Sequence, residues 1–171
     1  KALPFCDAIG KSWEQQSCYS GAFMQNIVVD QQIHESVNLK ADDPVYPCNA
    51  VAAQYKPPCY LMVTSNVLKA MGYDYAKAFA VCNNVETDYV PICYQSMGRD
   101  ISGNSLLDPA KVIELCGHGR SERQADCYVG AAKNAVFNDR NVVKASQLCD
   151  AVAVRFRETC TAARDEAAST I

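Results

Sequence analysis

Several hallmarks of enzymes and metal proteins are missing from this chain of 171 residues. There is no CxxC pair and no CxxCH haem-attachment motif, and the histidines are His34 and His118 alone. Clustered metal ligands and thiol-exchange chemistry are therefore disfavoured. The GxSxG, P-loop, HExxH and Rossmann glycine patterns are also missing. The sequence favours a protein with no catalytic residues, no metal and no cofactor.

Long apolar runs, strand patterns and a strong net charge are missing too. A membrane-spanning helix needs about eighteen consecutive apolar residues, and every apolar run in this chain is much shorter, so no membrane span is expected. The net charge of −3 and the pI near 5.3 give no reason to expect nucleic acid as a partner. The β-branched runs are short and do not alternate between turn dipeptides, which disfavours a sheet. A hydrophobic content of 49% with 20% charged residues is typical of a folded globular chain.

Cysteine is the residue that this chain has in excess. Ten cysteines occur, and an even number without clustered metal ligands favours disulfides. Because cytosolic thiols are kept reduced, disulfides indicate an oxidising compartment, and we expect a secreted or periplasmic protein. The chain opens with "KALPFC", as expected of a secreted protein whose signal peptide has been removed.

The cysteines recur with a near-constant step. They form five pairs, in which a trailing cysteine follows a leading one after eleven or twelve positions. The leading cysteines are Cys6, Cys48, Cys82, Cys116 and Cys149. The trailing cysteines are Cys18, Cys59, Cys93, Cys127 and Cys160. Successive leading cysteines are 42, 34, 34 and 33 residues apart, so the chain consists of five repeated units.

Other positions keep the same step. Seven places after the leading cysteine, four of five units have an aromatic residue: Trp13, Tyr55, Tyr89, Arg123 and Phe156. The residue directly after the trailing cysteine is Tyr19, Tyr60, Tyr94, Tyr128 and, in the last unit, Thr161. We expect these tyrosines to pack against the disulfides. A polar column, Asn66, Asp100 and Asn134, either lines a groove or hydrogen-bonds the backbone of the next repeat.

Each unit is expected to form two helices. "DYAKAFAVC" and "DPAKVIELC" place apolar residues near one helical face, and Asp108-Pro109 is a favourable helix start. "PPCYLMVTSNVLKAMG" begins with prolines that a first helical turn tolerates and ends at Gly72. A disulfide would close the corner between the two helices and stabilise it by roughly 2–3 kcal/mol. The predicted fold class is all-α, a disulfide-stapled α-solenoid of about five helix-turn-helix repeats with a period of 33–34 residues.

The five units are expected to form one helical-repeat domain over residues 1–171. Between Cys18 and Cys48 lie 29 residues, where later units have 21 or 22. The excess forms an insertion at residues 27–46. The last unit loses its tyrosine and becomes small and polar, which is typical of a C-terminal cap, here at about residues 150–171.

The 34-residue step and the phrase "AKAFAVC…CYQSMGRD" carry a resemblance to a known family. A helix that ends in cysteine and a helix that opens with cysteine-tyrosine resemble the secreted, cysteine-rich tetratricopeptide-like solenoids of bacteria. The likeness extends over all 171 residues in the length of the repeat, but the residues that are characteristic of that family are not matched. It implies protein or peptide binding on a concave face, and it implies no catalytic residues.

The insertion is the candidate site, because insertions in repeat proteins form loops that often bind ligands. It contains Asp30, His34, Glu35, Asp42 and Asp43. Asp30 and His34 are four residues apart and would share a helix face, and the acidic pair could complete a divalent-ion site. The structural alternative is a solvated helix extension and an acidic helix cap, since "DDP" is a common helix start.

The favoured function is a protein–protein interaction module or an accessory subunit of a larger assembly, with another protein or peptide as its partner. The alternative is a metal- or small-ligand-binding protein that uses the insertion at residues 27–46. A hydrolytic enzyme is a remote third hypothesis. Stoichiometric copper, zinc or calcium that is lost on changing His34 or Asp43 would favour the alternative.

The spacing favours disulfides within units, while bridges between units, such as Cys18–Cys48, are alternative pairings. Mass spectrometry of unreduced peptides should therefore identify Cys6–Cys18, Cys48–Cys59, Cys82–Cys93, Cys116–Cys127 and Cys149–Cys160. Linked peptides that join two different units would contradict this prediction and change the expected helix packing.

Overall fold

The computed structural model describes residues 3–28, 36–138 and 140–170. Within these ranges the chain forms ten α-helices and no strand, and it has one isolated bridge between Lys40 and Asp43. The α-helices are α1 (Leu3–Asp7), α2 (Ser12–Ile27), α3 (Lys56–Tyr60), α4 (Thr64–Ala70), α5 (Tyr75–Asn83), α6 (Val90–Asn104), α7 (Pro109–Cys116), α8 (Gln124–Phe137), α9 (Val142–Ala151) and α10 (Val154–Ala168). Two short 3₁₀-helices are η1 (Ala53–Tyr55) and η2 (Thr87–Tyr89). The all-α prediction is confirmed.

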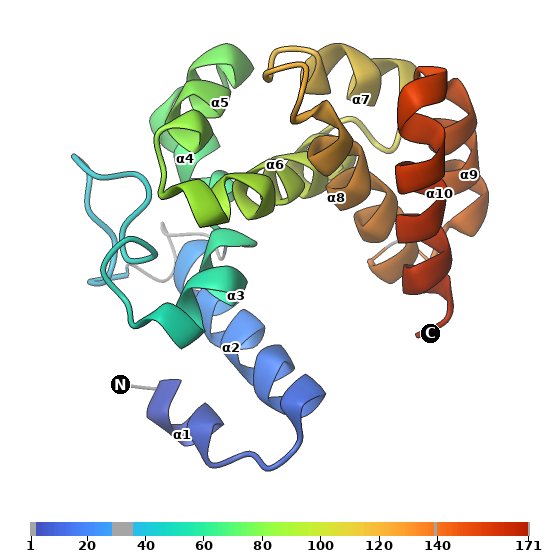
Figure 1. Ribbon diagram of the computed structural model, residues 1–171. Coiled ribbons are helices and arrows are strands. Elements are labelled where there is room, and N and C mark those ends of the chain that lie inside the picture. The colour runs from blue at the N-terminus through green and yellow to red at the C-terminus, as the bar shows by residue number, and fades with distance from the viewer. Residues whose placement is uncertain (1–2, 29–35, 139, 171) are drawn as a thin grey trace.

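The helices follow one another along an arch (Figure 1). α1 and α2 lie at one foot of the arch, and α9 and α10 lie at the other. None of the described helices combines the length and the apolar character that crossing a membrane requires.

All ten cysteines are paired, and each disulfide joins two cysteines of the same unit. The Cα–Cα distances run from 5.3 Å for Cys48–Cys59 to 5.9 Å for Cys116–Cys127. In the third to fifth units the bridges link α5 to α6, α7 to α8 and α9 to α10. The bridges therefore close the corners between paired helices, as the spacing predicts.

Local signals begin and end the helices of the later units. The Asp74 carboxylate accepts from the Lys77 N–H at the start of α5, and the Asp108 carboxylate accepts from the Ala110 N–H before Pro109 at the start of α7. Gly72 has a φ of 61° and follows the C-cap of α4, a conformation that glycine adopts without steric cost.

The second unit departs from the predicted pair of helices. Residues 41–51 form turns instead of a first helix, because Pro44 and Pro47 lack the N–H groups that a helix needs. The expected second helix is also split, into α3 and α4, at residues 61–63. Arg99 of α6 supports this break, since its Nη1 donates to the Leu61 carbonyl at 2.9 Å. The helix-turn-helix prediction is therefore wrong for this unit.

The second helices of successive units pack against one another in chain order. α2 contacts α3, α4 contacts α6, α6 contacts α8, and α8 contacts α10. Among the first helices, α7 packs against α9. The second, third and fourth units therefore each bury one side against the unit before and another against the unit after.

Aromatic pairs join the units, and they explain the two aromatic columns of the sequence. The tyrosine after a trailing cysteine packs on the aromatic residue of the next unit, with ring centroids 5.0 to 5.4 Å apart. The pairs are Tyr19–Tyr55, Tyr60–Tyr89 and Tyr128–Phe156. Such pairs contribute about 0.5–1.5 kcal/mol beyond the apolar area that they bury.

The fourth unit interrupts this series because Arg123 occupies the aromatic position. Tyr94 packs instead on Phe79 of its own unit, at a centroid distance of 4.8 Å. Its hydroxyl donates to the Asn83 Oδ1 and accepts from the Arg120 N–H. The hydrogen bond from the Arg120 N–H thus joins the third and fourth units where the ring contact is missing.

α6 and α8 cross with their backbones in close approach. A Cβ atom on Gly98 would lie 1.9 Å from the Cys127 carbonyl oxygen, and one on Gly130 would lie 1.9 Å from the Gln95 carbonyl oxygen. Glycine is required at both positions because any other side chain would push the two helices apart.

The equivalent positions between the second and third units are Thr64 and Ser96. Thr64 and Gly98 each lie five residues after the trailing cysteine of their unit. Ser96 and Gly130 each lie three residues after the trailing cysteine of theirs. The two hydroxyl oxygens are 2.6 Å apart and fully buried. Small residues therefore meet at both crossings.

Replacing Gly98 by alanine is expected to destabilise the protein by about 1–3 kcal/mol, because the new methyl group meets backbone atoms that cannot move aside. Gly103→Ala is the matched control in the same helix, where nothing lies within 4 Å of the new Cβ. The control should gain up to about 1 kcal/mol from helix propensity. Urea unfolding of both variants measures the difference, and equal stabilities would contradict the close crossing.

Candidate functional site

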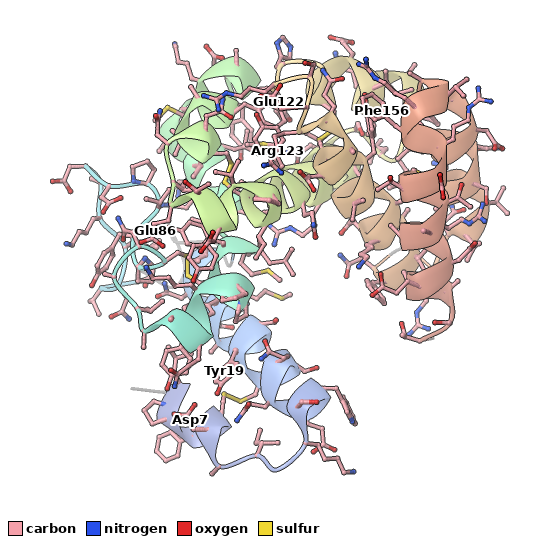
Figure 2. All side chains as sticks on the ribbon, in the orientation of Figure 1. Asp7, Tyr19, Glu86, Glu122, Arg123 and Phe156 are labelled. Atoms are coloured by element: carbon pink, nitrogen blue, oxygen red, sulfur yellow. A yellow bond between two sulfur atoms is a disulfide. The ribbon has the colours of Figure 1, made fainter. Side chains whose placement is uncertain are left out.

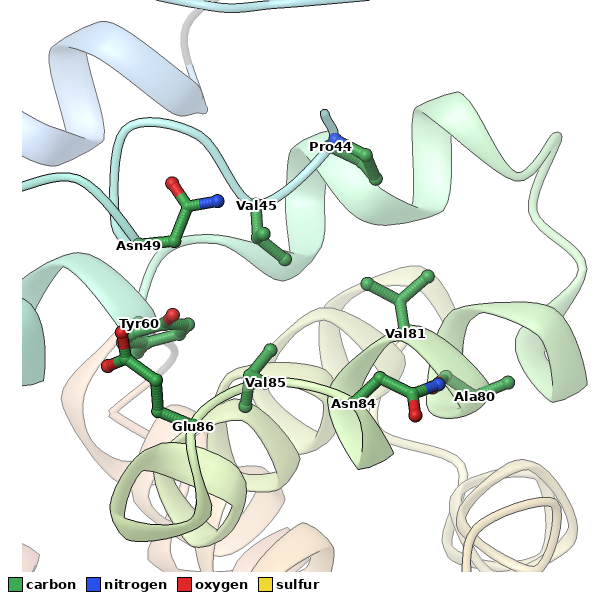
Figure 3. Close-up of a pocket in the computed structure, with 9 residues that line it drawn as sticks. All are labelled: Pro44, Val45, Asn49, Tyr60, Ala80, Val81, Asn84, Val85 and Glu86. Atoms are coloured by element: carbon green, nitrogen blue, oxygen red, sulfur yellow. The ribbon is translucent and has the colours of Figure 1, made fainter. Parts of the chain in front are cut away.

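A pocket of about 420 Å³ lies beside the second unit. Turn residues form one wall, and the end of α5 with the segment after it forms the opposite wall (Figure 3). The lining residues are Pro44, Val45, Asn49, Tyr60, Ala80, Val81, Asn84, Val85 and Glu86. Most of them are apolar, and the polar side chains are few.

The pocket lies where the second unit has turns in place of a first helix. The turns at residues 41–51 leave part of the α5 surface open. The interruption of the repeat thus generates the site.

Hydrogen bonds hold the turn wall in place. The Asn66 Nδ2 donates to the Pro44 carbonyl at 2.9 Å. The Asp43 carboxylate accepts from the Val45 N–H at 3.3 Å and from the Asn49 Nδ2 at 2.8 Å. This wall of the pocket is therefore pre-formed.

Tyr60 is fully buried beside the pocket. Its ring stacks on Tyr89 with an interplanar angle of 10°, whereas its hydroxyl has no hydrogen-bond partner in the described part of the chain. Burial, together with the charges of Glu86 and Asp43, raises the pKa of Tyr60 to about 12. The hydroxyl therefore stays protonated at neutral pH and remains a donor.

Glu86 lies at the same end of the pocket as Tyr60 (Figure 3). The Lys56 Nζ donates to both oxygens of this carboxylate, at 2.5 and 2.7 Å. The pair is charge-balanced, and the lining contains no histidine, cysteine or serine that could act as a nucleophile or base.

The predicted insertion site is described only in part. Asp30, His34 and Glu35 lie outside the described residues. Asp42 is exposed, and Asp43 supports the pocket wall. Across residues 3–28, 36–138 and 140–170, no three histidine, cysteine, aspartate or glutamate side chains come together as a metal site. A metal site in the insertion stays a prediction.

The polar column of Asn66, Asp100 and Asn134 contributes to contacts between segments of the fold. The Asp100 carboxylate accepts from the Thr64 hydroxyl at 2.7 Å, and the Asn134 Nδ2 donates to the Ser102 hydroxyl at 2.8 Å. Asn66 bonds a backbone carbonyl, whereas the other two bond side chains of the preceding unit. None of the three lines the pocket described above.

A second cluster of titratable groups joins the first two units. The Asp7 carboxylate accepts from the Tyr19 hydroxyl at 2.5 Å and from the Tyr55 hydroxyl at 2.6 Å. Asp7 and Tyr19 face one another beside α2 (Figure 2). The hydrogen bond from Tyr19, followed by that from Tyr55, lowers the pKa of Asp7, and the same bond raises the pKa of Tyr19 to about 12.

We expect Asp7 to make the stability of the fold depend on pH in the acid range. Because its pKa is lowered on folding, the carboxylate stabilises the fold above its ordinary pKa of 3.8, and the contribution is lost as pH falls through the folded-state value. Asp7→Asn should therefore lower the urea midpoint at neutral pH and flatten its fall towards about pH 2.

Tyr55→Phe is the control for this prediction, since it keeps Asp7 and one of its two donors. Its acid dependence should fall between those of the wild type and Asp7→Asn. Parallel pH profiles for the wild type and Asp7→Asn would contradict the role of this carboxylate. Urea unfolding from about pH 7 to about pH 2 measures all three proteins.

No protein-family model matches this chain, and no curated protein or solved structure matches it either. The residues that bear on function are therefore those that its own fold singles out. Sequence reasoning missed Tyr60, Val81 and Val85 as pocket residues. The available signal was the pair Pro44 and Pro47, at a place where the later units have a helix.

Proposed function

We propose that this chain is an interaction module of an oxidising compartment, secreted or periplasmic, and that it binds another protein or peptide. In this proposal its units stack as a tetratricopeptide-like solenoid. The stacking of second helices in chain order and the five intra-unit disulfides support it.

The observation that carries the proposal is the exposure of Trp13. This residue holds the aromatic position of the first unit, near the start of its second helix. In the second, third and fifth units the same position packs against the tyrosine of the preceding unit. Trp13 instead is 66% exposed, and Phe5 of the same unit is 80% exposed.

Exposed tryptophan is costly in water and common at the centre of protein interfaces. The contact that joins the units also indicates which side chain of a partner would pack well on Trp13. An aromatic side chain of a partner, above all a tyrosine, would pack on Trp13 as Tyr19 packs on Tyr55. The last unit has Thr161 in place of the tyrosine, so it lacks the ring that makes this contact.

Selection of peptides from a displayed random library on the oxidised protein tests this function. We expect tyrosine-containing peptides whose binding is saturable and is lost after reduction and alkylation of the disulfides. Trp13→Ala should weaken their binding at least tenfold without changing stability, because the side chain is exposed.

Tyr73→Ala is the matched control, since it removes another exposed aromatic side chain, one that is 59% exposed. It should leave binding unchanged. Peptides that bind the unfolded chain equally well, or that ignore Trp13→Ala, would contradict the proposal.

A further inference from the structure

We propose that the pocket between the 44–49 turns and the end of α5 binds an uncharged, apolar small molecule that carries a single hydrogen-bond-accepting oxygen, such as a ketone. This goes beyond the proposed interaction with a protein. It concerns a different place on the molecule and does not depend on Trp13.

The argument begins with the hydroxyl of Tyr60. Two tyrosines at the same position of other units have an acceptor for their hydroxyl. Tyr19 donates to Asp7, and Tyr94 donates to Asn83. Tyr60 is fully buried and has no such partner among the described residues. A buried donor without an acceptor is costly, and a ligand oxygen that displaces the side chains covering this hydroxyl would remove that cost.

The walls of the pocket determine the rest of the ligand. Val45, Val81 and Val85 form its interior with Pro44 and Ala80. A volume of about 420 Å³ falls within the range of roughly 300–1,000 Å³ that small-molecule sites have. Aliphatic walls with few polar groups favour a compact apolar body over a sugar or another polyol.

The charges near Tyr60 exclude an anion. Glu86 lies at the same end of the pocket, and Asp43 holds the facing turn. The nearby cation, Lys56, already donates to both oxygens of Glu86 and is largely buried. Because Lys56 balances Glu86, the charge of Asp43 remains, and a carboxylate ligand would find no free positive partner, so a neutral oxygen is the preferred acceptor.

Three probes of similar shape separate these contributions: menthone, which carries a ketone; p-menthane, its hydrocarbon counterpart; and p-menthane-3-carboxylate, an anion. The methyl resonances of Val45, Val81 and Val85 in ¹H–¹³C spectra report on the pocket. Menthone should shift them saturably, p-menthane should bind more weakly, and the carboxylate should bind most weakly.

Tyr60→Phe removes the hydroxyl alone. It should weaken menthone binding about fivefold, the effect of one hydrogen bond, and leave p-menthane binding unchanged. Tyr128→Phe is the matched control, because Tyr128 holds the same position of its unit and lies outside the pocket lining. It should bind menthone as the wild type does.

Ala80→Trp tests the pocket without altering Tyr60. Ala80 is exposed and lines the pocket, so a large side chain there should block menthone. Ala76→Trp is its control, one turn earlier on the exposed surface of α5 and outside the lining. This pair keeps the proposal testable if Tyr60→Phe does not fold.

Menthone binding that Ala80→Trp abolishes and Tyr60→Phe weakens would support the proposal. It would be overturned if no probe shifted the three valines, if the carboxylate bound best, or if menthone and p-menthane bound equally. Peptide binding through Trp13 would be unaffected by either result, so failure of the pocket and failure of the interaction function are distinguishable.

Discussion

The packing of each unit's second helix on the second helix of the next unit is the contact on which the rest of the structure depends. A pair of short helices cannot bury its apolar side alone, and the disulfide within a unit constrains only the corner between the two helices. Burial is completed when Tyr60 stacks on Tyr89, or Tyr128 packs on Phe156, across a boundary between units. Small residues at the crossings, such as Gly98 and Gly130, let the backbones come close enough for these contacts to form.

The candidate sites follow from places where this regular packing stops. At the second unit, Pro44 and Pro47 prevent a first helix, and the flank of α5 is left partly uncovered. At the outer side of the first unit, Trp13 occupies a position that elsewhere lies under a neighbouring tyrosine. At both places a side chain or helix surface is left exposed in a region where other units make contacts with a neighbouring element.

Much of the fold could be predicted because its signals are local. The constant cysteine spacing predicted the bridges within units, and Asp108-Pro109 and Gly72 marked a helix start and a helix end correctly. The prediction failed for the second unit, where the period of the cysteines continues although the helix does not. The aromatic columns were visible in the sequence, but the pairing of their rings between successive units was not. Regular spacing along the chain does not show which residue of a neighbouring unit a side chain contacts.

The sequence by itself determined the all-α class, the five units and the pairing of their cysteines. These depend on contacts between residues close in the chain, which spacing and residue type describe well. Only the tertiary structure decided that Asp7 of the first unit would accept from Tyr55 of the second, that Tyr60 would be buried with its hydroxyl unpaired, and that Val45 would face Val81 across a pocket. Those outcomes depend on how units pack in space, and packing is set by the combined shape of side chains that lie far apart in the sequence.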